Sequence, residues 1–364
     1  MTRRADVHRI AMQSPDDVSG IRLLIEQARL DPCTVVAVLG KTEGNGCVND
    51  FTRGYATQSL RHLFSHWLSE DQLDKVPFVM SGGTEGGLSP HWIVITVKKN
   101  EEPPQNSATV AQALAVGSAV TRDLLPSELG RCVQADIVKQ GVLKAMHQAN
   151  IQSPDDVHLV QVKCPLLTSG RIEQVGGDVA TTDTLKSMSL SRAASALGVG
   201  MALGEVARVD DVRIGTDLSL WSGRASCSAG IELMGCEIVV LGQSISWSGP
   251  LRVAHAVMQD TIDASTLMDL IARTSGERYA SAHGSHIVAT LAKAEASSTG
   301  HIRGSRHTML NDSDIAATRH VRSFVGGLLA GLVGNTEIFV SGGAEHQGPD
   351  GGGPVAIIYS TDSL

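Results

Sequence analysis

Lysine, arginine and serine recur along this chain three times, in the same order. Each lysine ends an apolar stretch ("TVVAVLGK", "VHLVQVK" and "HIVATLAK"), and each arginine lies near the start of a helical pattern. Each serine opens the pattern S-[GA]-G-x-E, written SGGTE, SAGIE and SGGAE. The three sets are Lys41, Arg53 and Ser81; Lys163, Arg192 and Ser228; and Lys293, Arg322 (or Arg319) and Ser341.

A serine beside a neutral lysine is a known arrangement for nucleophilic catalysis. The pKa of a lysine, ordinarily about 10.4, must then fall by several units, which burial and a nearby arginine both promote. The Gly or Ala after each serine lets a backbone N–H approach a carbonyl oxygen as negative charge develops on it. These parts predict hydrolysis of an amide or imide. The residues alone do not rank the three serines, and Ser226 competes with Ser228 as the hydroxyl of the middle set.

Taken singly, these residues have ordinary structural explanations. Ser-Gly-Gly after a strand is usually a turn, and lysine or arginine at the end of an element is usually solvated. Their recurrence in order favours function. Other catalytic patterns fit less well, because "LGKTEGNG" lacks the first glycine of a P-loop and no histidine recurs with the serines. Cys164 and Cys227 have no counterparts in the other sets, and packing is the better interpretation for both.

The elements around these residues form three similar units, at about 1–105, 110–250 and 251–364. Each is predicted to run β-α-β-α-β-β, beginning with the strands Val7–Met12, Ala113–Val120 and Arg252–Met258. Residues 101–109 are predicted to be a linker between the first and second units. The boundary between the second and third units, near Gly249–Pro250, is less sharply marked in the sequence. The fold class is therefore α/β (α+β), a mixed sheet backed by helices in each unit.

Three such units in one chain can close around a pseudo-threefold axis, as a fused trimer does. Nine polar side chains would then meet in one central, dry cavity that holds the active site. The glycine-rich second helices of the second and third units suggest close backbone approach near that axis, since each glycine costs about 0.8–1 kcal/mol of helix propensity. The alternative is three independent domains in a row.

Composition excludes several classes of partner. The chain has 364 residues and a net charge of −8, which disfavours binding to nucleic acid or an anionic membrane. Its most apolar stretch, Phe324–Gly334, is far shorter than the roughly 20 residues that span a bilayer. The N-terminus shows no signal-peptide pattern, so a cytoplasmic protein is expected. The six cysteines form no C-x-x-C pair, which argues against a zinc site or a disulfide framework.

Several long motifs resemble the cyanuric acid hydrolase/barbiturase family. They include "GKTEGNGCVNDFTR", "FVMSGGTEG", "SRAASALG", "RHTMLNDSDI" and "SGGAEHQGPDGGGP", and the resemblance covers essentially the whole chain. It implies three units around a pseudo-threefold axis, one central active site, no catalytic metal and a homotetramer. It implies ring opening of a small cyclic imide: cyanuric acid gives carboxybiuret, which loses CO₂ to form biuret, in s-triazine degradation. Barbituric acid, giving ureidomalonate, is the alternative substrate, and a non-catalytic binding protein for a small cyclic ligand is the alternative class.

The resemblance also implies individual roles. Ser228 would be the nucleophile and Lys163 its base, while Arg322 is preferred to Arg319 from its spacing before the last SGG. The remaining residues would bind the ring: Lys41, Arg53, Ser81, Gly82, Arg192, Ala229, Lys293, Arg322, Ser341 and Gly342. Some relatives bind a structural Mg²⁺ or Ca²⁺ near the C-terminal glycine-rich loop. Its oxygen ligands here would come from Glu295, Ala344, Gln347, Gly348, Pro349 and Gly352.

Overall fold

The computed structural model describes residues 2–100, 112–275 and 286–362. The interpretation of 101–109 as a linker falls outside these ranges. Within them, three successive stretches of chain each run strand, helix, strand, helix, strand, strand, with a few short additions. The order of elements is therefore the one that the sequence predicts.

The first sheet has the strand order β3-β2-β4-β1-β9. Its strands are β1 (Thr2–Ala11), β2 (Val35–Thr42), β3 (Phe78–Gly82), β4 (His91–Asn100) and β9 (Trp247–Ser248). The helices of this stretch are α1 (Ser19–Glu26), α2 (Phe51–Phe64) and α3 (Glu70–Leu73). The carboxylate of Asp50 caps α2 by accepting a hydrogen bond from the backbone N–H of Thr52, which fixes where this helix begins.

The second sheet has the order β5-β8-β6-β7, and the third has the order β10-β15-β11-β14. The second stretch contains β5 (Ala113–Val120), α4 (Cys132–Gln148), β6 (Val157–Pro165), α5 (Ser169–Gln174), α6 (Thr184–Ala202), β7 (Ala225–Gly230) and β8 (Glu237–Ser244). The third contains β10 (Leu251–Met258), α7 (Ala264–Ser275), β11 (Ile287–Ala294), α8 (Ala317–Val333), β14 (Phe339–Gly342) and β15 (Gly353–Ser360), with the small hairpin β12 (His301–Ile302) and β13 (Ser305–Arg306). Single-turn 3-10 helices lie at Pro32–Thr34, Pro126–Glu128, Pro154–Asp156 and Asp211–Arg213.

All three sheets share one topology. In each, the second and third strands of the stretch pair in parallel, and the fourth strand lies antiparallel between the first and the second. The exception is β9, which follows β8 along the chain but pairs in parallel with β1 of the first sheet. The last residues of the second stretch therefore join the sheet of the first.

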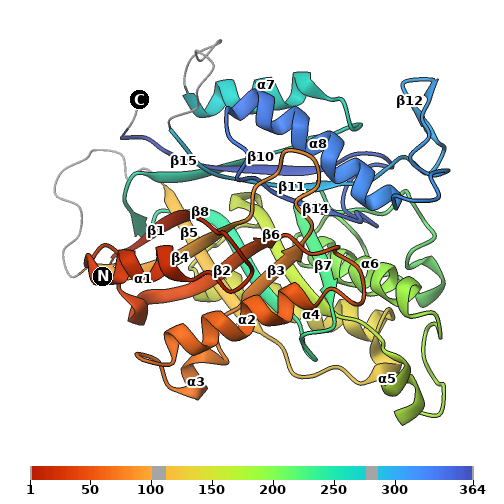
Figure 1. Ribbon diagram of the computed structural model, residues 1–364, viewed down its shortest axis with the longest axis horizontal. Coiled ribbons are helices and arrows are strands. Elements are labelled where there is room, and N and C mark those ends of the chain that lie inside the picture. Colours follow the sequence, from red (N-terminus) through yellow and green to blue (C-terminus); the bar gives the residue numbers. More distant parts are fainter. Residues whose placement is uncertain (1, 101–111, 276–285, 363–364) are drawn as a thin grey trace.

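Helices lie mostly toward the outside, and strands fill the interior (Figure 1). Strands β3, β6, β7 and β14 lie close together in the middle of the view, and residues of β3 contact β6 and β14, while β14 also contacts β7. One large apolar core joins residues of all three sheets, including Leu39, Val79, Val160, Leu291 and Phe339. Of the three strands that carry the serines, β14 thus contacts both of the others.

The glycines of the second helices do not all have the explanation expected. A Cβ on Gly198 of α6 would lie 2.4 Å from the carbonyl oxygen of Ala135 in α4, so this glycine allows two helices to pack closely. A Cβ on Gly326 of α8 would lie 2.9 Å from Cγ of Leu88, so this glycine makes room for the Leu88 side chain. Gly327 and Gly331 of α8, however, have no heavy atom within 4 Å of such a Cβ and are exposed. The expectation that these glycines bring backbones together near an axis is wrong for Gly327 and Gly331.

Within the described ranges, no helix has both the length and the apolar character needed to cross a bilayer.

Candidate active site

Each lysine of the three sets lies directly opposite the serine of its own set. In the parallel pairing of the second and third strands, Lys41 is the register partner of Ser81, Lys163 of Ser228, and Lys293 of Ser341. Neighbouring strands are about 4.8 Å apart, so register partners hold their side chains close together. The three Ser-Lys pairs predicted from sequence are therefore built by one repeated strand pairing.

The lysines also connect one sheet to the next. The Nζ of Lys163 donates a hydrogen bond of 2.6 Å to the carbonyl of Met80, the residue before Ser81. The Nζ of Lys293 donates one of 2.7 Å to the carbonyl of Cys227, the residue before Ser228. The polar groups of different sheets therefore meet in one region of the molecule.

The lysines, arginines and serines of the three sets are all buried, none being more than 7% exposed. Burial lowers the pKa of Lys41 well below its usual value, and the charge of Arg322 lowers it further. Burial and the charge of Arg192 lower the pKa of Lys293 to about 7. Burial also lowers the pKa of Lys163; the charge of Glu232 opposes this effect and that of Arg53 adds to it. A depressed lysine pKa is what the proposed base requires.

One of the three serines differs from the other two. The hydroxyl of Ser81 accepts a hydrogen bond from Lys41 at 3.2 Å, and that of Ser341 accepts one from Lys293 at 3.3 Å. The hydroxyl of Ser228 is buried and has no hydrogen-bond partner among the described residues. Buried polar atoms are nearly always paired, so the unpaired hydroxyl of Ser228 needs an explanation, and it leaves this hydroxyl available to a ligand.

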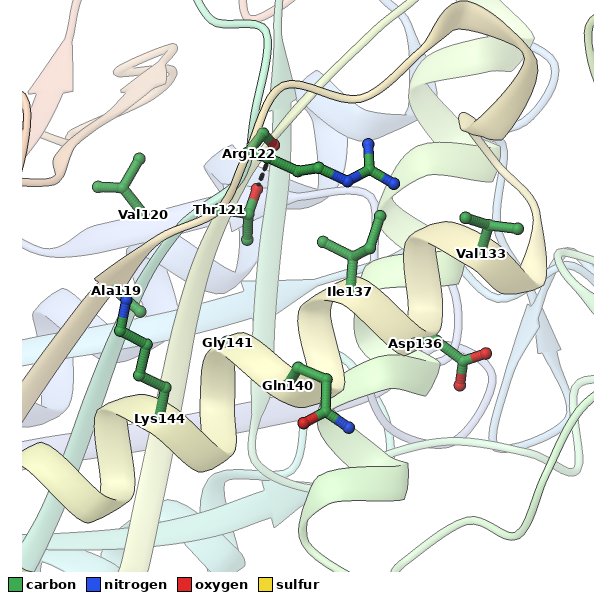
Figure 2. Close-up of a pocket in the computed structure, with 10 residues that line it drawn as sticks. All are labelled: Ala119, Val120, Thr121, Arg122, Val133, Asp136, Ile137, Gln140, Gly141 and Lys144. Carbon is green, nitrogen blue, oxygen red and sulfur yellow. Dashed lines mark hydrogen bonds between the residues drawn. The ribbon is translucent and has the colours of Figure 1, made fainter.

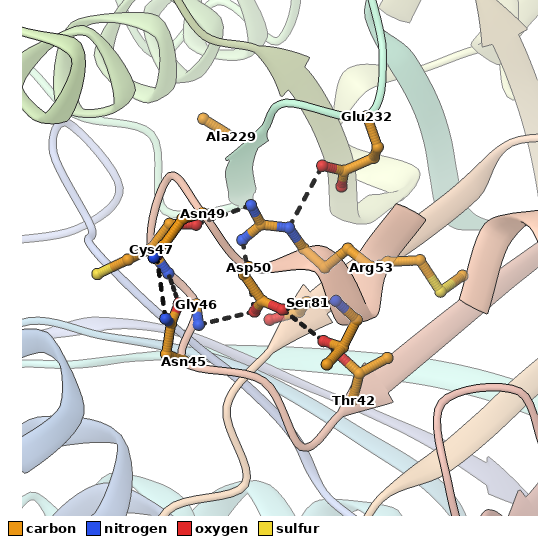
Figure 3. Close-up of polar contacts among 12 residues, drawn as sticks. Thr42, Asn45, Gly46, Cys47, Asn49, Asp50, Arg53, Ser81, Ala229 and Glu232 are labelled. Atoms are coloured by element: carbon orange, nitrogen blue, oxygen red, sulfur yellow. Dashed lines mark hydrogen bonds and ion pairs between the residues drawn. The ribbon is translucent and has the colours of Figure 1, made fainter. Parts of the chain in front are cut away.

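The three arginines form a closed cycle of ion pairs between the three stretches of chain. Arg53 of the first stretch pairs with Glu232 of the second (Figure 3), at 3.3 Å. Arg192 of the second pairs with Glu345 of the third at 2.6 Å, and Arg322 of the third pairs with Glu85 of the first. Each glutamate is the last residue of the S-[GA]-G-x-E pattern.

This cycle explains why the pattern contains its second glycine. A Cβ on Gly83 would lie 2.6 Å from Nη2 of Arg322, and one on Gly343 would lie 2.6 Å from Cζ of Arg192. Both glycines also have positive φ, a conformation that other residues rarely adopt. At Gly230 the obstacle would be the carboxylate of Glu232 itself.

The roles of these glutamates escaped the sequence interpretation, although the signal was present. The pattern places a glutamate at the same position in all three sets, and the arginines were interpreted only as ligands of a ring. The cycle also separates the two arginine candidates of the third set. Arg322 takes the place equivalent to Arg53 and Arg192, whereas Arg319 donates only to the carbonyl of Asp314 among the described residues. The geometry favours Arg322.

The second sheet carries two further polar residues where the other sheets are apolar. Gln161 and Ser226 are register partners, and each lies two residues before Lys163 or Ser228 on its strand. Their side chains therefore point to the same face as the Lys163–Ser228 pair, and both are buried. The corresponding pairs are Leu39 with Val79 and Leu291 with Phe339. Neither the amide of Gln161 nor the hydroxyl of Ser226 has a hydrogen-bond partner in the described part of the chain.

The glycine-rich loop after Ser341 offers oxygen atoms for the predicted cation. The Glu295 carboxylate accepts a hydrogen bond from the backbone N–H of Ala344, and burial together with the charge of Glu345 raises its pKa to about 7. The carbonyls of Ala344 and Pro349 accept backbone hydrogen bonds, which leaves each a second lone pair. One carboxylate with several carbonyls suits a hard cation. No cluster of three or more His, Cys, Asp or Glu side chains with metal-ligand geometry occurs among the described residues.

Among the cavities outside the cluster of serines and lysines are two that border helices α2 and α4. One, of about 880 Å³, opens beside the Arg53–Glu232 pair and is lined in part by Asp50, Phe51, Tyr55, Glu232 and Glu237. The other, of about 470 Å³, lies between the end of β5 and helix α4 (Figure 2). None of the site residues predicted from sequence lines the second cavity.

A buried serine beside a lysine of depressed pKa is the arrangement of a hydrolase that uses a Ser-Lys pair. Comparison with known proteins gives the family. The model of the amidohydrolase ring-opening protein family matches residues 6–360, and the chain belongs to this family.

Curated relatives match over almost their full length. A cyanuric acid amidohydrolase of Azorhizobium caulinodans is 55% identical over 359 residues, which is 97% of this chain and 98% of the relative. One from Enterobacter cloacae is 47% identical, covering 98% of this chain and 100% of the relative.

Two solved structures of cyanuric acid hydrolases have the same fold. The one from A. caulinodans gives a TM-score of 0.92 at 54% identity and covers 98% of this chain and 99% of that chain. The other gives 0.94 at 45% identity, with 99% and 100% covered.

Proposed function

We propose that this protein is a cyanuric acid amidohydrolase that opens the triazine ring by hydrolysis, with Ser228 as nucleophile and Lys163 as base. The single observation that carries the role assignment is the unpaired hydroxyl of Ser228, opposite a buried lysine, where the other two serines are hydrogen bonded. Relatives of nearly equal length that carry the name cyanuric acid amidohydrolase support the choice of substrate.

The reaction proceeds through an acyl-enzyme. Neutral Lys163 accepts the proton of Ser228 as Oγ attacks a ring carbonyl carbon, and the backbone N–H of Ala229 stabilises the oxyanion. The ring C–N bond breaks, and Lys163 returns the proton to the departing ring nitrogen. Water then cleaves the carbamate ester and restores the serine. The product, carboxybiuret, loses CO₂ and leaves biuret.

The remaining groups hold the ring in place. The three stretches, 1–105, 110–250 and 251–364, lie around a pseudo-threefold axis, which matches the threefold symmetry of cyanuric acid. Ser81 with Gly82, and Ser341 with Gly342, donate to the two carbonyls that do not react. Arg53, Arg192 and Arg322 hold the edges of the ring, together with Lys41 and Lys293. The closed cycle of arginine–glutamate pairs supports this arrangement.

The direct test is release of biuret and CO₂ from cyanuric acid by the purified protein. Barbituric acid is offered in a parallel assay, and ring opening of barbituric acid alone would move the assignment to barbiturase. Binding of cyanuric acid without turnover would indicate a binding protein. Lys163→Ala is expected to abolish turnover, and retained turnover in this variant would remove Lys163 from the role of base.

Two further features belong to this proposal. A structural Mg²⁺ or Ca²⁺ would be held by Glu295 and by oxygens of Ala344, Gln347, Gly348, Pro349 and Gly352, where it neutralises a buried carboxylate and takes no part in the reaction. Chelation should then lower the melting temperature. The protein assembles as a homotetramer, which light scattering can measure.

A further inference from the structure

The three arginine–glutamate pairs are not equivalent. Glu345 receives hydrogen bonds from both Nε and Nη2 of Arg192, and Glu85 from the same two nitrogens of Arg322. Glu232 receives a hydrogen bond from Nε of Arg53 alone, through its Oε2 atom.

Arg53 directs its other nitrogens elsewhere. Its Nη2 donates to the carbonyl of Cys47 at 2.9 Å, and its Nη1 lies 3.8 Å from the carboxylate of Asp50. Figure 3 shows the Arg53 guanidinium between Glu232 and Asp50. This division leaves the second oxygen of Glu232 free to face another partner.

That partner is the lysine proposed as the base. Oε1 of Glu232 lies 3.0 Å from Nζ of Lys163, with exposed side-chain fractions of 7% and 1%. The contact is an ion pair without hydrogen-bond geometry, and Oε1 accepts no hydrogen bond from any described residue. No corresponding ion pair joins Lys41 to Glu85 or Lys293 to Glu345 within the described ranges.

We propose that Glu232 is a positioning residue for catalysis, which holds Lys163 opposite Ser228 and supplies the negative charge that keeps this lysine an effective base. The inference rests on the proposed function, since it takes Lys163 as the base of the reaction. Glu232 acts through Lys163 and forms no bond to the substrate.

The charges around Lys163 explain why a carboxylate is needed. The groups that face it are Glu232 from the loop after β7, Arg53 from α2, Cys164 from β6 and Glu237 from β8. Burial and Arg53 both disfavour the protonated form of the lysine, and Glu232 favours it. A base works best when its pKa lies near the operating pH. Glu232 therefore limits how far the pKa falls and stabilises the ammonium ion that forms when Ser228 gives up its proton.

The test is the pH profile of Glu232→Gln, which removes the charge and keeps the size. Because kcat/KM requires neutral Lys163, its acid limb reports the pKa of this lysine. Loss of an opposite charge at this distance should move the limb to lower pH by about one unit or more. We expect kcat at the optimum to fall by about ten-fold or more as the base weakens. NMR titration of isotope-labelled lysine measures the same shift without substrate.

Two variants act as controls. Glu85→Gln removes the matching carboxylate of Arg322, which makes no ion pair with Lys163, and should leave the limb in place. Glu232→Asp keeps the charge and should return the limb toward its wild-type position. If E232Q does not fold, Arg53→Met tests the same network with the opposite sign, because loss of that cation should raise the pKa of Lys163.

The outcomes separate this inference from the function on which it rests. An unchanged acid limb and an unchanged lysine titration in E232Q would overturn the role of Glu232, while turnover of cyanuric acid by the wild type would still support the proposed function. A wild type that does not consume cyanuric acid would count against the proposed function, and the lysine titration would still decide whether Glu232 controls Lys163.

Discussion

Ser226 and Ser228 show how register, more than residue type, distinguishes two candidates on one strand. They lie two residues apart on β7, so their side chains point to the same face. The register partner of Ser228 is Lys163, whereas that of Ser226 is Gln161, which cannot act as a base. The sequence makes both serines candidates, and strand pairing places a lysine opposite Ser228 only.

Alanine substitution should separate the two hydroxyls. Ser228→Ala is expected to lower kcat by about a thousand-fold or more, as loss of a nucleophile does. Ser226→Ala should retain most of the activity, because its hydroxyl has no lysine opposite it. Steady-state rates with cyanuric acid measure both effects. Loss of activity in Ser226→Ala with retention in Ser228→Ala would reverse the assignment.

Much of the site could be predicted from residue types, because lysine, arginine and serine recur in order. The partners of the arginines could not, since sequence order does not say that Arg53 faces Glu232, 179 residues away. The unpaired state of Ser228 depends on where Nζ of Lys163 points, and Lys163 points to Met80 of another sheet. Such contacts arise only when the stretches come together.

At the level of elements, the turn after each serine strand is shaped by a side chain from another stretch. Gly83 follows β3 with a φ of 104° and lies against Arg322 of helix α8. The positive φ of this turn favours glycine. The close approach of the Arg322 guanidinium also leaves no room for a side chain. The turn and the helix must therefore fit together.

Two glycine-to-alanine substitutions test this contrast. Gly83→Ala should destabilise the protein by about 2 kcal/mol or more, because positive φ alone costs about 1–2 kcal/mol and Arg322 must also move. Gly327→Ala in α8 should stabilise it by about 0.5–1 kcal/mol through helix propensity, since nothing obstructs the new methyl group. Melting temperatures of both variants give the comparison. A loss of only about 1 kcal/mol in Gly83→Ala, the cost of positive φ alone, would mean that Arg322 does not restrict Gly83.

The pattern of strands and helices was predictable because apolar runs ending in polar loops recur with the same order. The addition of β9 to the first sheet was not, because two residues carry no periodic signal. The exposed glycines Gly327 and Gly331 misled the interpretation, since glycine in a helix marks close packing only when another element approaches it. Sequence shows which residues are small and leaves open what lies beside them.

At the scale of the whole molecule, the cycle of ion pairs joins the third stretch of chain to the first. Arg322 and Glu85 lie 237 residues apart in sequence and have side-chain exposures of only 5% and 20%. Buried pairs of this kind are costly to break one partner at a time, because the remaining charge is left without compensation.

Removing one partner of the Arg322–Glu85 pair should therefore lower the stability of the fold. Arg322→Met is expected to lower the free energy of unfolding by about 3–5 kcal/mol, and the double variant with Glu85→Gln should lose less than the sum of the two single changes. The exposed pair Arg131–Asp178 is the control, and Arg131→Met should cost about 0–1 kcal/mol. Urea unfolding measures all four variants. Strict additivity at Arg322 and Glu85 would contradict the coupling.

Gln161 and Ser226 pair in the second sheet where the other two sheets have apolar pairs, a difference that only a single chain can hold. In an assembly of three identical chains, one substitution would appear in all three sheets, and so no sheet could differ from the others. Because the three stretches are parts of one chain, one stretch can change while the other two keep apolar residues at the corresponding positions. One sheet can therefore hold polar groups that the other two do not share.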